Sequence, residues 1–451
     1  MIADLKPYPA MKDSGVPWLG EVPEHWEVRR LKHICRLAYG DALATDVREH
    51  GTVPVYGSNG RVGFHSSANT KAPCVVIGRK GSFGKVNFSS EPVFAIDTTF
   101  FLDDRFSAGN VRWLFYLLGW LRLDEVSKDS AVPGLDREDA YQRVAAVPPL
   151  PQQSAIACFL DHADRRIRRY LRAKQKLIKL LEEQKQAIIH RAVTCGLDPT
   201  VRLKPSGVEW LGDVPEHWEV QRVKQVSQVL RGKFTHRPRN DPSLYDGPYP
   251  FIQTGEVARA EKSITGYRQT LNERGLAVSK MFPAGTLVMT IAANIGDVAV
   301  LDFKACFPDS VVGFVPRTGV KRDYLYYVFR AMKPELLREA PVNTQGNLNV
   351  DRIGSRGIVL PSTSEQQVII QQIEESTLGL NAAIDRAQRE IALLREYRTR
   401  LIADVVTGKL DVREAAAQRP DESEVDDQSE PLIEELEAEE PENTIDDEVE
   451  A

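Results

Sequence analysis

The chain has 451 residues, of which 42% are hydrophobic, so it is too long for one compact core and two or more domains are expected. No apolar run reaches the roughly 18 residues of a membrane helix and the N-terminus lacks a signal-peptide pattern, which argues against membrane and secreted proteins. The net charge of −6 hides a division, because residues 1–419 carry +10 while residues 420–451 hold sixteen acidic side chains and no basic one.

A phrase near the N-terminus occurs twice. "SGVPWLGEVPEHWEV" at residues 14–28 returns as "SGVEWLGDVPEHWEV" at residues 206–220, with thirteen of fifteen positions identical. The proline before Glu-His-Trp predicts a short helical turn. The tryptophans are predicted to be buried and to hold each domain on a long helix. They are Trp18, Trp26, Trp210 and Trp218. His25 and His217 are interpreted as packed framework residues, because no nucleophile or carboxylate cluster recurs near both.

The repeat continues through the middle of each copy. "CVVIGRKGSFGKV" at residues 74–86 aligns with "TLVMTIAANIGDV" at residues 286–298, and Asp97 aligns with Asp309. Short alternating runs punctuated by Gly, Asn and Pro predict a compact, mostly antiparallel α+β domain in each copy. "WLFYLLGWL" at residues 113–121 predicts a buried helix. The middles diverge far more than the opening phrase, and the second copy is about twenty residues longer there.

Each copy ends in a long amphipathic helix. Apolar residues recur in alternating steps of four and three from Ile156 to Ile188 and again from Ile369 to Leu401. This spacing predicts a coiled-coil seam in each copy. Two such helices in one chain favour antiparallel packing, with the copies related by a pseudo-twofold axis. The alternative is that each helix packs only on its own domain.

These features together resemble the specificity (S) subunit of a Type I restriction–modification enzyme. The resemblance rests on "GVPWLGEVPEHWEV", "VIGRKGSFGKV" and the helix start "VPPLPQQSAIACFLD", with counterparts in the second copy, and covers residues 14–411. Gln152 departs from the Glu that the family has in this helix start, whereas Glu365 keeps it.

The resemblance implies an α+β fold with two pseudo-twofold-related target-recognition domains. Two long antiparallel coiled-coil helices would join them, and a disordered acidic C-terminal tail would follow. The expected parts are a first recognition domain at residues 1–150, a central helix at 151–200, a second recognition domain at 201–362, a C-terminal helix at 363–411 and the tail at 412–451.

In function, the resemblance implies that each domain reads one half of a bipartite DNA target while the helical rod sets the spacer. Base edges and phosphates are contacted by basic and amide side chains on loops. "GRKGSFGK" is the best cluster, because glycines let the backbone approach DNA while Arg and Lys reach phosphate or guanine. The candidate contacts are Tyr56, Ser58, Asn59, Arg61, Arg79, Lys80, Ser82 and Lys85 in the first copy and Lys233, Thr235, His236, Arg237, Arg239, Gln253, Asn294, Asn343, Gln345, Asn347 and Asn349 in the second.

The sequence contains no recognisable catalytic or metal-binding motif. A phosphate loop, an adenine-methyltransferase N/D-P-P-Y/F run and zinc-ligand spacing are all missing. The resemblance therefore implies a non-catalytic subunit that binds double-stranded DNA, two methyltransferase subunits and restriction/translocase subunits. S-adenosylmethionine, ATP and Mg²⁺ are expected on those partners, and each methyltransferase would flip an adenine out of its half-site. Five cysteines without a CxxC pair indicate free thiols in a reducing cytoplasm.

Two other interpretations stay open at this point. The chain could serve a related restriction system in which one partner carries both methyltransferase and nuclease. It could also be a two-headed coiled-coil adaptor that binds proteins and no DNA. The acidic tail could screen the basic domains or serve solubility.

Overall fold

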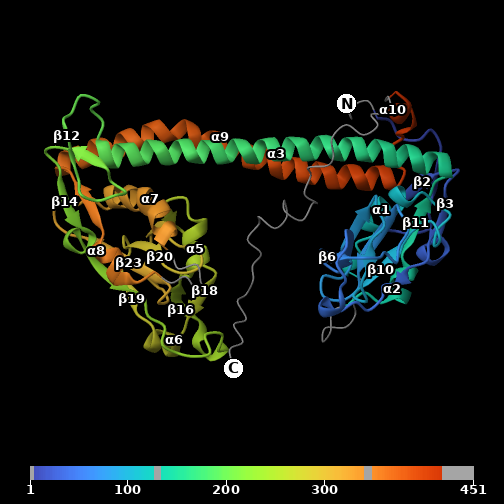
Figure 1. Ribbon diagram of the computed structural model, residues 1–451, viewed down its shortest axis with the longest axis horizontal. Coiled ribbons are helices and arrows are strands. Elements are labelled where there is room, and N and C mark those ends of the chain that lie inside the picture. The colour runs from blue at the N-terminus through green and yellow to red at the C-terminus, as the bar shows by residue number, and fades with distance from the viewer. Residues whose placement is uncertain (1–4, 126–133, 340–347, 419–451) are drawn as a thin grey trace. The chain divides into compact units, whose positions relative to one another are not determined.

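The computed structural model describes residues 5–125, 134–339 and 348–418 (Figure 1). The predicted tail beyond residue 418 and the candidates Asn343, Gln345 and Asn347 lie outside these ranges. The chain forms two compact units, each described here by itself. Unit 1 comprises Met1–Arg172 and Ile391–Ala451, and unit 2 comprises Ala173–Glu390. The predicted disorder of residues 412–418 is wrong, because Val412 is buried in the core of unit 1 and helix α10 (Arg413–Ala417) follows it. None of the helices in the described ranges is long and apolar enough to cross a membrane.

Unit 1 is built around an antiparallel sheet of four strands in the order β4-β10-β7-β8. Strand β7 is buried throughout because its two faces enter different cores. Val75 and Ile77 pack with helix α1 (Val111–Trp120), whereas Cys74 and Val76 face a second cluster. A smaller sheet in the order β6-β5-β9 and two strand pairs complete the unit. The strands are β1 (Met11–Asp13), β2 (Glu21–Pro23), β3 (Glu27–Arg30), β4 (Ala38–Tyr39), β5 (Val53–Gly57), β6 (Gly60–His65), β7 (Cys74–Gly78), β8 (Val86–Ser89), β9 (Phe94–Ala95), β10 (Thr99–Leu102) and β11 (Val144–Val147).

Unit 2 repeats this plan with one addition. Its main sheet has the order β15-β23-β20-β21-β17, in which the first four strands correspond to β4-β10-β7-β8 and β17 adds a parallel edge. Helix α7 (Arg322–Glu339) takes the place of α1 (Figure 1). The strands are β12 (Leu203–Pro205), β13 (Asp213–Pro215), β14 (Glu219–Arg222), β15 (Ser227–Arg231), β16 (Tyr245–Phe251), β17 (Ser263–Ile264), β18 (Gln269–Leu271), β19 (Met281–Phe282), β20 (Leu287–Thr290), β21 (Val298–Leu301), β22 (Ala305–Cys306), β23 (Val311–Pro316) and β24 (Gly357–Leu360).

The two long helices are α3 (Leu150–Cys195) and α9 (Thr363–Val406), and each contributes to both units. In unit 1, Asp164 of α3 forms an ion pair of 2.5 Å with Arg398 of α9. In unit 2, Lys174 pairs with Glu390 at 2.5 Å. Unit 1 contains the start of α3 beside the end of α9, and unit 2 contains the end of α3 beside the start of α9. The two helices therefore pack antiparallel. The predicted fold class, two repeated α+β domains with long antiparallel helices, is confirmed.

A buried tryptophan forms the junction between domain and helices in each unit. The indole of Trp26 donates to Oε1 of Gln152 at 2.8 Å, and that of Trp218 donates to Oε1 of Glu365 at 2.9 Å. Each indole also packs against the glycine that follows the opposite helix, Gly408 or Gly196, where a Cβ would come within 3.0 or 3.3 Å of the ring. Both glycines have positive φ angles, which end the helices in the left-handed region.

The other predictions for the repeated phrase agree with the structure for the histidines and are wrong for Trp18 and for the helical turn. His25 and His217 contact the same Gln152 and Glu365 side chains, in agreement with a framework role. Trp18 was predicted to be buried, and this is wrong: it is 53% exposed and lies against Trp120. Trp210 is half-buried and donates to the Gly357 carbonyl at 3.1 Å. The residues after Pro23 form a hydrogen-bonded turn that closes strand β2, instead of the predicted helical turn.

In α3 the predicted seam residues up to Ile167 are buried or half-buried. Beyond Ile167 each buried residue of the seam is the one that follows a predicted position. Ile156, Leu160 and Ile167 are buried as predicted, but the next buried residue is Leu171, while Tyr170 is 53% exposed. A strict heptad pattern drifts by about 20° per heptad relative to a straight α-helix, so contacts in a nearly straight pair move to the neighbouring residue. In α9 a shift by one residue is confined to Thr377 and Ile384, which are buried in place of the predicted Ser376 and Ala383. Ala387 and Leu401, farther along the same seam, are buried as predicted.

Candidate nucleic-acid interface

The loop between β7 and β8 carries the basic cluster that the sequence singled out. We call residues 79–85 loop 1. The N–H of Arg79 donates to the Thr98 carbonyl and the Arg79 carbonyl accepts from Leu135, each at 2.8 Å. The N–H of Gly84 donates to Gly78 at 2.9 Å. Gly84 has a φ of +79°, and a Cβ there would lie 2.2 Å from the Asp124 nitrogen, so only glycine fits.

The loop between β20 and β21 has the same backbone in unit 2. We call residues 291–297 loop 2. The N–H of Ile291 donates to the Ser310 carbonyl and its carbonyl accepts from Leu348, each at 2.9 Å. Gly296, with a φ of +81°, donates to Thr290 at 2.9 Å. Every one of these bonds matches one in loop 1.

The side chains on the two loops are different. The sequence of loop 1 is RKGSFGK and that of loop 2 is IAANIGD. Loop 1 therefore has three basic residues, whereas loop 2 has none. Ala293 has a φ of +56° at the position where Gly81 has +72°, which is a costly conformation for a residue with a Cβ. Asp297 of loop 2 forms an ion pair of 2.5 Å with Lys333 of α7. The shared framework thus presents two chemically different surfaces.

Most candidates in unit 1 gather beside loop 1. Ser58 and Asn59 form the turn between β5 and β6. The Ser58 hydroxyl donates to the Thr98 carbonyl at 2.7 Å, and Lys85 Nζ donates to Asn59 Oδ1 at 3.1 Å. Lys80 and Ser82 are exposed. Arg61 is also exposed and lies 5.4 Å from the centroid of the Phe64 ring on β6. The contact between Lys85 and Asn59 therefore joins loop 1 and the turn after β5 into one polar and basic surface. Ser58 is a correction to the candidate set, because its side chain is only 9% exposed and its hydroxyl is bonded within the fold.

Tyr56 is a correction to the candidate set. Its side chain is only 4% exposed and packs in the buried cluster with Cys74, Val76 and Phe101. Its neighbours Val55 and Gly57 are buried as well, because both faces of β5 are covered here, so Tyr56 is a core residue and not a surface contact.

In unit 2, several candidates lie on the loop between β15 and β16. Lys233, Thr235, Arg237 and Arg239 are exposed there. Asp309 pairs with Arg239 at 2.8 Å and with Arg237 at 3.7 Å. A hydrogen bond from the Arg237 guanidinium to the Phe234 carbonyl adds a further restraint. The two arginines are therefore held by the fold while remaining exposed.

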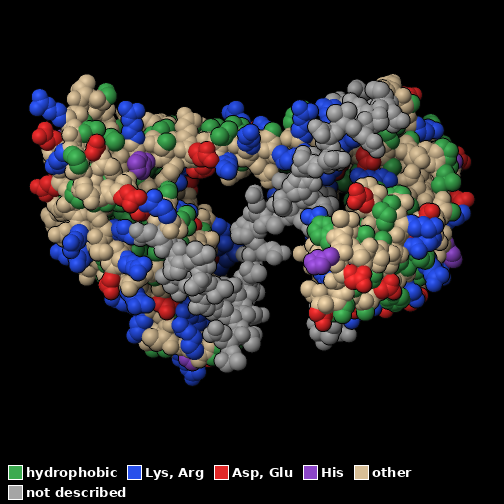
Figure 2. Space-filling view, viewed as in Figure 1, with side chains coloured by type: hydrophobic (Ala, Val, Ile, Leu, Met, Phe, Trp, Pro, Cys, Tyr) green, Lys and Arg blue, Asp and Glu red, His purple; other side chains and the backbone are tan. Residues whose placement is uncertain are grey.

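The remaining candidates of unit 2 are spread over other elements. Gln253 is exposed before α5 (Thr254–Arg259) and donates to Gln269 of β18. Asn294 is exposed in loop 2, Asn349 caps α8 (Val350–Ser355), and His236 bonds Asp241 at 3.1 Å. Figure 2 shows Lys and Arg side chains at the end of unit 2 that carries α6 (Glu273–Val278).

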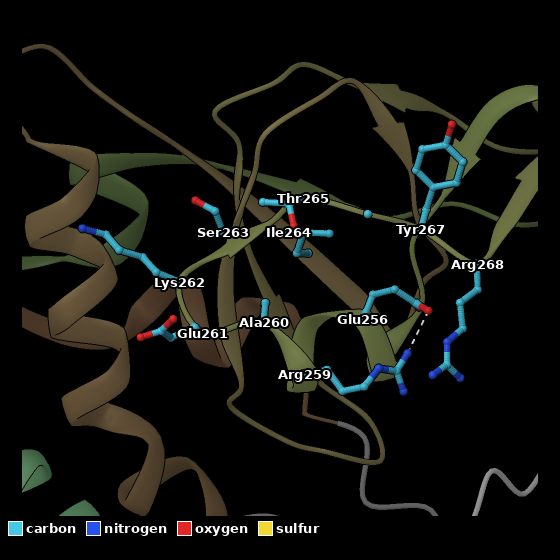
Figure 3. A pocket seen from close by; sticks show the side chains of 11 residues that line it. Glu256, Arg259, Ala260, Glu261, Lys262, Ser263, Ile264, Thr265, Tyr267 and Arg268 are labelled. Atoms are coloured by element: carbon cyan, nitrogen blue, oxygen red, sulfur yellow. Dashed lines mark hydrogen bonds and ion pairs between the residues drawn. The ribbon is translucent and has the colours of Figure 1, made fainter. Parts of the chain in front are cut away.

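A pocket of about 600 Å³ lies beside β17, in the part of unit 2 that has no counterpart in unit 1 (Figure 3). Arg259 on its wall pairs with Glu256 at 2.9 Å. Lys262, the residue before β17, forms ion pairs with Glu374 of α9 at 2.7 Å and with Asp323 of α7 at 3.1 Å. Burial would lower the pKa of Lys262, but these carboxylates outweigh it and raise the pKa.

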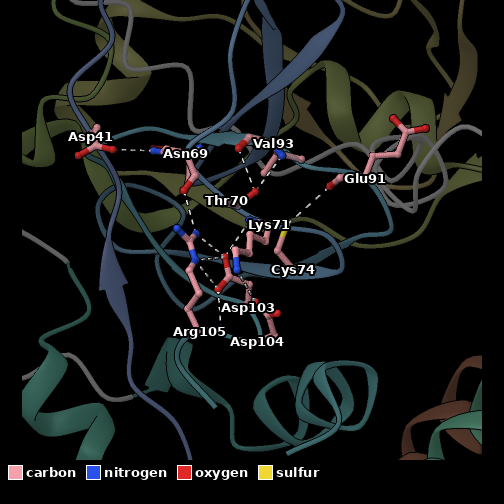
Figure 4. A network of polar contacts seen from close by, with 11 residues as sticks. Asp41, Asn69, Thr70, Lys71, Cys74, Glu91, Val93, Asp103, Asp104 and Arg105 are labelled. Carbon is pink, nitrogen blue, oxygen red and sulfur yellow. Dashed lines mark hydrogen bonds and ion pairs between the residues drawn. The ribbon is translucent and has the colours of Figure 1, made fainter. Parts of the chain in front are cut away.

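A buried ionic network lies at the end of strand β7 opposite loop 1 (Figure 4). The Asp103 side chain is fully buried and accepts from Arg105 Nε at 2.9 Å and from the Lys71 N–H at 2.8 Å. Burial alone would raise the pKa of Asp103, but these hydrogen bonds outweigh it and hold the pKa below its ordinary value. Asn69 then bonds both backbone groups of Ala95, in the strand that leads to Thr98.

Tyr39 and Arg137 lie near loop 1 and were not among the residues predicted from the sequence. The guanidinium carbons of Arg79 and Arg137 lie 5.2 and 4.9 Å from the centroid of the Tyr39 ring. Tyr39 ends β4 and Arg137 begins α2 (Arg137–Gln142), so no local pattern links them. Comparison of the two copies could have found them, since unit 2 has different residue types there. In the described ranges no group of three or more His, Cys, Asp or Glu side chains could hold a metal ion.

Comparison with known proteins gives a consistent result. A family model described as Type I restriction modification DNA specificity domain matches residues 23–180 and again residues 215–386. The Type I restriction enzyme MjaIX specificity subunit of Methanocaldococcus jannaschii is 27% identical over 35% of this chain and 38% of that subunit. The putative type I restriction enzyme MjaX specificity subunit of the same organism is 21% identical over 88% of this chain and 96% of that subunit. A solved chain, described with the complex assembly and conformational transition of the type I R-M system, shares the fold. Its TM-score is 0.58 at 15% identity over 86% of this chain and 99% of that chain.

Proposed function

The chain belongs to the Type I restriction–modification DNA specificity family, and from this premise we propose that each unit reads one half of a bipartite DNA target. The observation that carries the proposal is the pair of loops with one backbone and two sets of side chains. Two halves of different sequence need different base-contacting groups on the same scaffold. Loop 1 and the Ser58–Asn59 turn would contact the first half, and Arg237, Arg239 and loop 2 the second.

The long helices would set the spacer between the halves. Their antiparallel contacts involve charged pairs in both units, Asp164 with Arg398 and Lys174 with Glu390. Such pairs favour one helical register, because a shift by a turn would separate both. A fixed register would give the spacer a fixed length.

The same helices offer equivalent surfaces for two methyltransferase subunits. Leu180 on α3 in unit 2 is 53% exposed, and Leu393 on α9 in unit 1 is 63% exposed. They occupy matching positions of the repeat, 213 residues apart. We infer one docking contact per copy from the repetition of this exposed leucine. S-adenosylmethionine would bind those methyltransferases, and ATP and Mg²⁺ the restriction/translocase subunits.

The test is a map of N6-methyladenine in DNA from cells that hold the partner methyltransferase, with and without this chain. A split motif that is methylated only when the chain is present is the expected result. A mark that does not depend on the chain would contradict the proposal. A partner that cuts and methylates from one polypeptide would point to the related restriction system.

A further inference from the structure

An exposed tyrosine in unit 1 lies beneath two arginines. Tyr39 is 48% exposed and its ring centroid is 5.0 Å from that of Phe100. Arg79 and Arg137 both approach this ring, at 5.2 and 4.9 Å. Arg79 is the first residue of loop 1, so the cluster adjoins the proposed DNA-reading surface.

The charge of this cluster is poorly neutralised. In the part of the chain that the structure describes, Arg79 has no ion pair, and Arg137 reaches only Glu138, at 3.8 Å. The Glu138 side chain is 72% exposed. The Nε atoms of both arginines are buried and have no hydrogen-bond partner among the described residues. Cation–π contact with a partly exposed ring does not neutralise a guanidinium charge, so two cations beside one ring form a site that favours an anion.

Unit 2 shows that the fold does not need these cations. Tyr39 pairs with Phe100 in β4–β10, and Arg231 pairs with Val312 at the same place in β15–β23. The counterparts of Arg79 and Arg137 are Ile291, which is 4% exposed, and Val350. Both aliphatic residues pack on the main core of unit 2. Aliphatic side chains therefore satisfy the fold at these positions, and the arginines of unit 1 need another explanation.

We propose that Tyr39, Arg79 and Arg137 bind one phosphate of the DNA backbone beside loop 1. The inference rests on the proposed DNA-reading function of unit 1. Guanidinium groups donate two parallel hydrogen bonds to phosphate oxygens, and the tyrosine ring holds them in place. A phosphate contact carries no sequence information, but it fixes the register of the domain on the duplex. Lys80 and Ser82 would then meet base edges.

The test uses the full chain and a labelled random-sequence DNA duplex, since a phosphate contact does not depend on sequence. An Arg79→Ile/Arg137→Val variant copies the residues of unit 2 and so keeps apolar packing. We expect about tenfold weaker binding at low salt, which is a loss typical of a charged hydrogen bond. The slope of log K against log salt should become shallower by about 0.9, the value for one phosphate. Arg29→Val, which removes a charge from β3, should leave the slope unchanged.

A second variant separates charge from geometry. Arg79→Lys/Arg137→Lys keeps both charges but loses the planar fork, so it should keep the wild-type salt slope and bind with intermediate affinity. Wild-type slopes in both double variants, with wild-type affinity, would overturn the phosphate site and leave DNA binding intact. Absence of duplex binding by the wild-type chain would overturn the proposed function itself. Thermal unfolding checks that each variant is folded, and the Lys variant decides the matter if the Ile/Val variant is not.

Discussion

Loop 1 and loop 2 have matching backbones and unlike side chains, whereas the tryptophan junctions match in their tryptophan, histidine and glycine and differ in the acceptor, Gln152 or Glu365. The loops share their three supporting hydrogen bonds and the glycine near their ends. The junctions share the buried indole, the acceptor at the start of a long helix and the glycine at the end of the other. The two units therefore keep the groups that support the loop backbones and the junctions, whereas the exposed side chains of the loops vary.

The junctions also show how much variation a framework position tolerates. Gln152 and Glu365 differ in charge, yet the amide oxygen of the first and a carboxylate oxygen of the second each accept from an indole N–H. The geometry of the indole contact survives because it requires only an acceptor oxygen, and both side chains also contact a histidine. The departure of Gln152 from the family pattern thus leaves the structure unchanged.

The largest effect is expected from the junctions. Trp26→Ala and Trp218→Ala should each lower the free energy of unfolding of their unit by about 3–5 kcal/mol, the cost of emptying a fully buried aromatic site. Equal losses would support equivalent junctions, whereas a neutral result at either one would break the comparison. Urea unfolding followed by amide hydrogen exchange would report each unit separately. Trp18→Ala is the control, because that side chain is largely exposed.

A smaller effect on the free energy of unfolding is expected from the buried carboxylate of Asp103, and it should occur in unit 1 alone. Asp103 has Val315 as its counterpart, so only unit 1 contains the buried carboxylate. Arg105→Ala should destabilise unit 1 by about 2–3 kcal/mol, because it removes charge-assisted hydrogen bonds.

The pH dependence of this effect follows from the sign of the shift. The pKa of Asp103 is lowered in the folded chain, so its contribution is fully present above the unfolded pKa of about 4. It is lost as the pH falls through the lower folded pKa. Asp103→Asn should remove this acid dependence from unit 1 and leave unit 2 unaffected, as measured by hydrogen exchange. An equal acid response in both units would contradict the assignment.

The proposed docking of methyltransferase subunits predicts a change of about tenfold in their affinity for this chain. Leu180→Asp and Leu393→Asp should each weaken binding of one methyltransferase subunit by about tenfold, since an exposed apolar contact contributes on the order of 1–2 kcal/mol. Each single variant should carry one tightly bound subunit in sedimentation experiments, and the double variant none. Gln184→Asp, also exposed on α3, is the matched control. Full occupancy of the double variant would exclude these leucines from the interface.

The smallest effect concerns the loop backbones. Ala293→Gly should stabilise unit 2 by about 1 kcal/mol, because the left-handed conformation costs a residue with a Cβ roughly that amount. Gly81→Ala should destabilise unit 1 by a similar amount. Chemical denaturation of the two variants measures both changes. Shifts of the same sign would mean that the two loops do not share this conformation in solution.

Much of the framework could be predicted from the sequence. The duplication, the strand-rich middles and the long helices follow from periodicity and turn residues, and Trp26 and Trp218 were found because both copies keep them. Trp18 failed the same reasoning, since repetition marks a residue as useful but does not say whether it is buried. The second half of the seam failed in α3 because spacings of 3.5 and 3.6 residues diverge only after several turns, whereas Ala387 and Leu401 of α9 are buried as predicted.

The candidate nucleic-acid interface could be predicted only in part. Loop 1 stands out through its glycines and basic residues, and the structure joins it to Ser58 and Asn59. Tyr39 and Arg137 meet Arg79 only through strand pairing and the position of α2, which local sequence does not reveal. Tyr56 was misjudged because alternation identifies the faces of a strand but not which face meets a second core.

The most direct test of the central claim exchanges one loop. Residues 79–85 are replaced with IAANIGD, which has the same length and backbone, and N6-methyladenine is mapped in cells that contain the partner methyltransferase. We predict that the wild-type chain directs methylation to a split motif, and that the exchanged chain relaxes or changes one half while the other half stays as it was. A continuous motif, or a change in both halves, would contradict the assignment of one half-site to each unit.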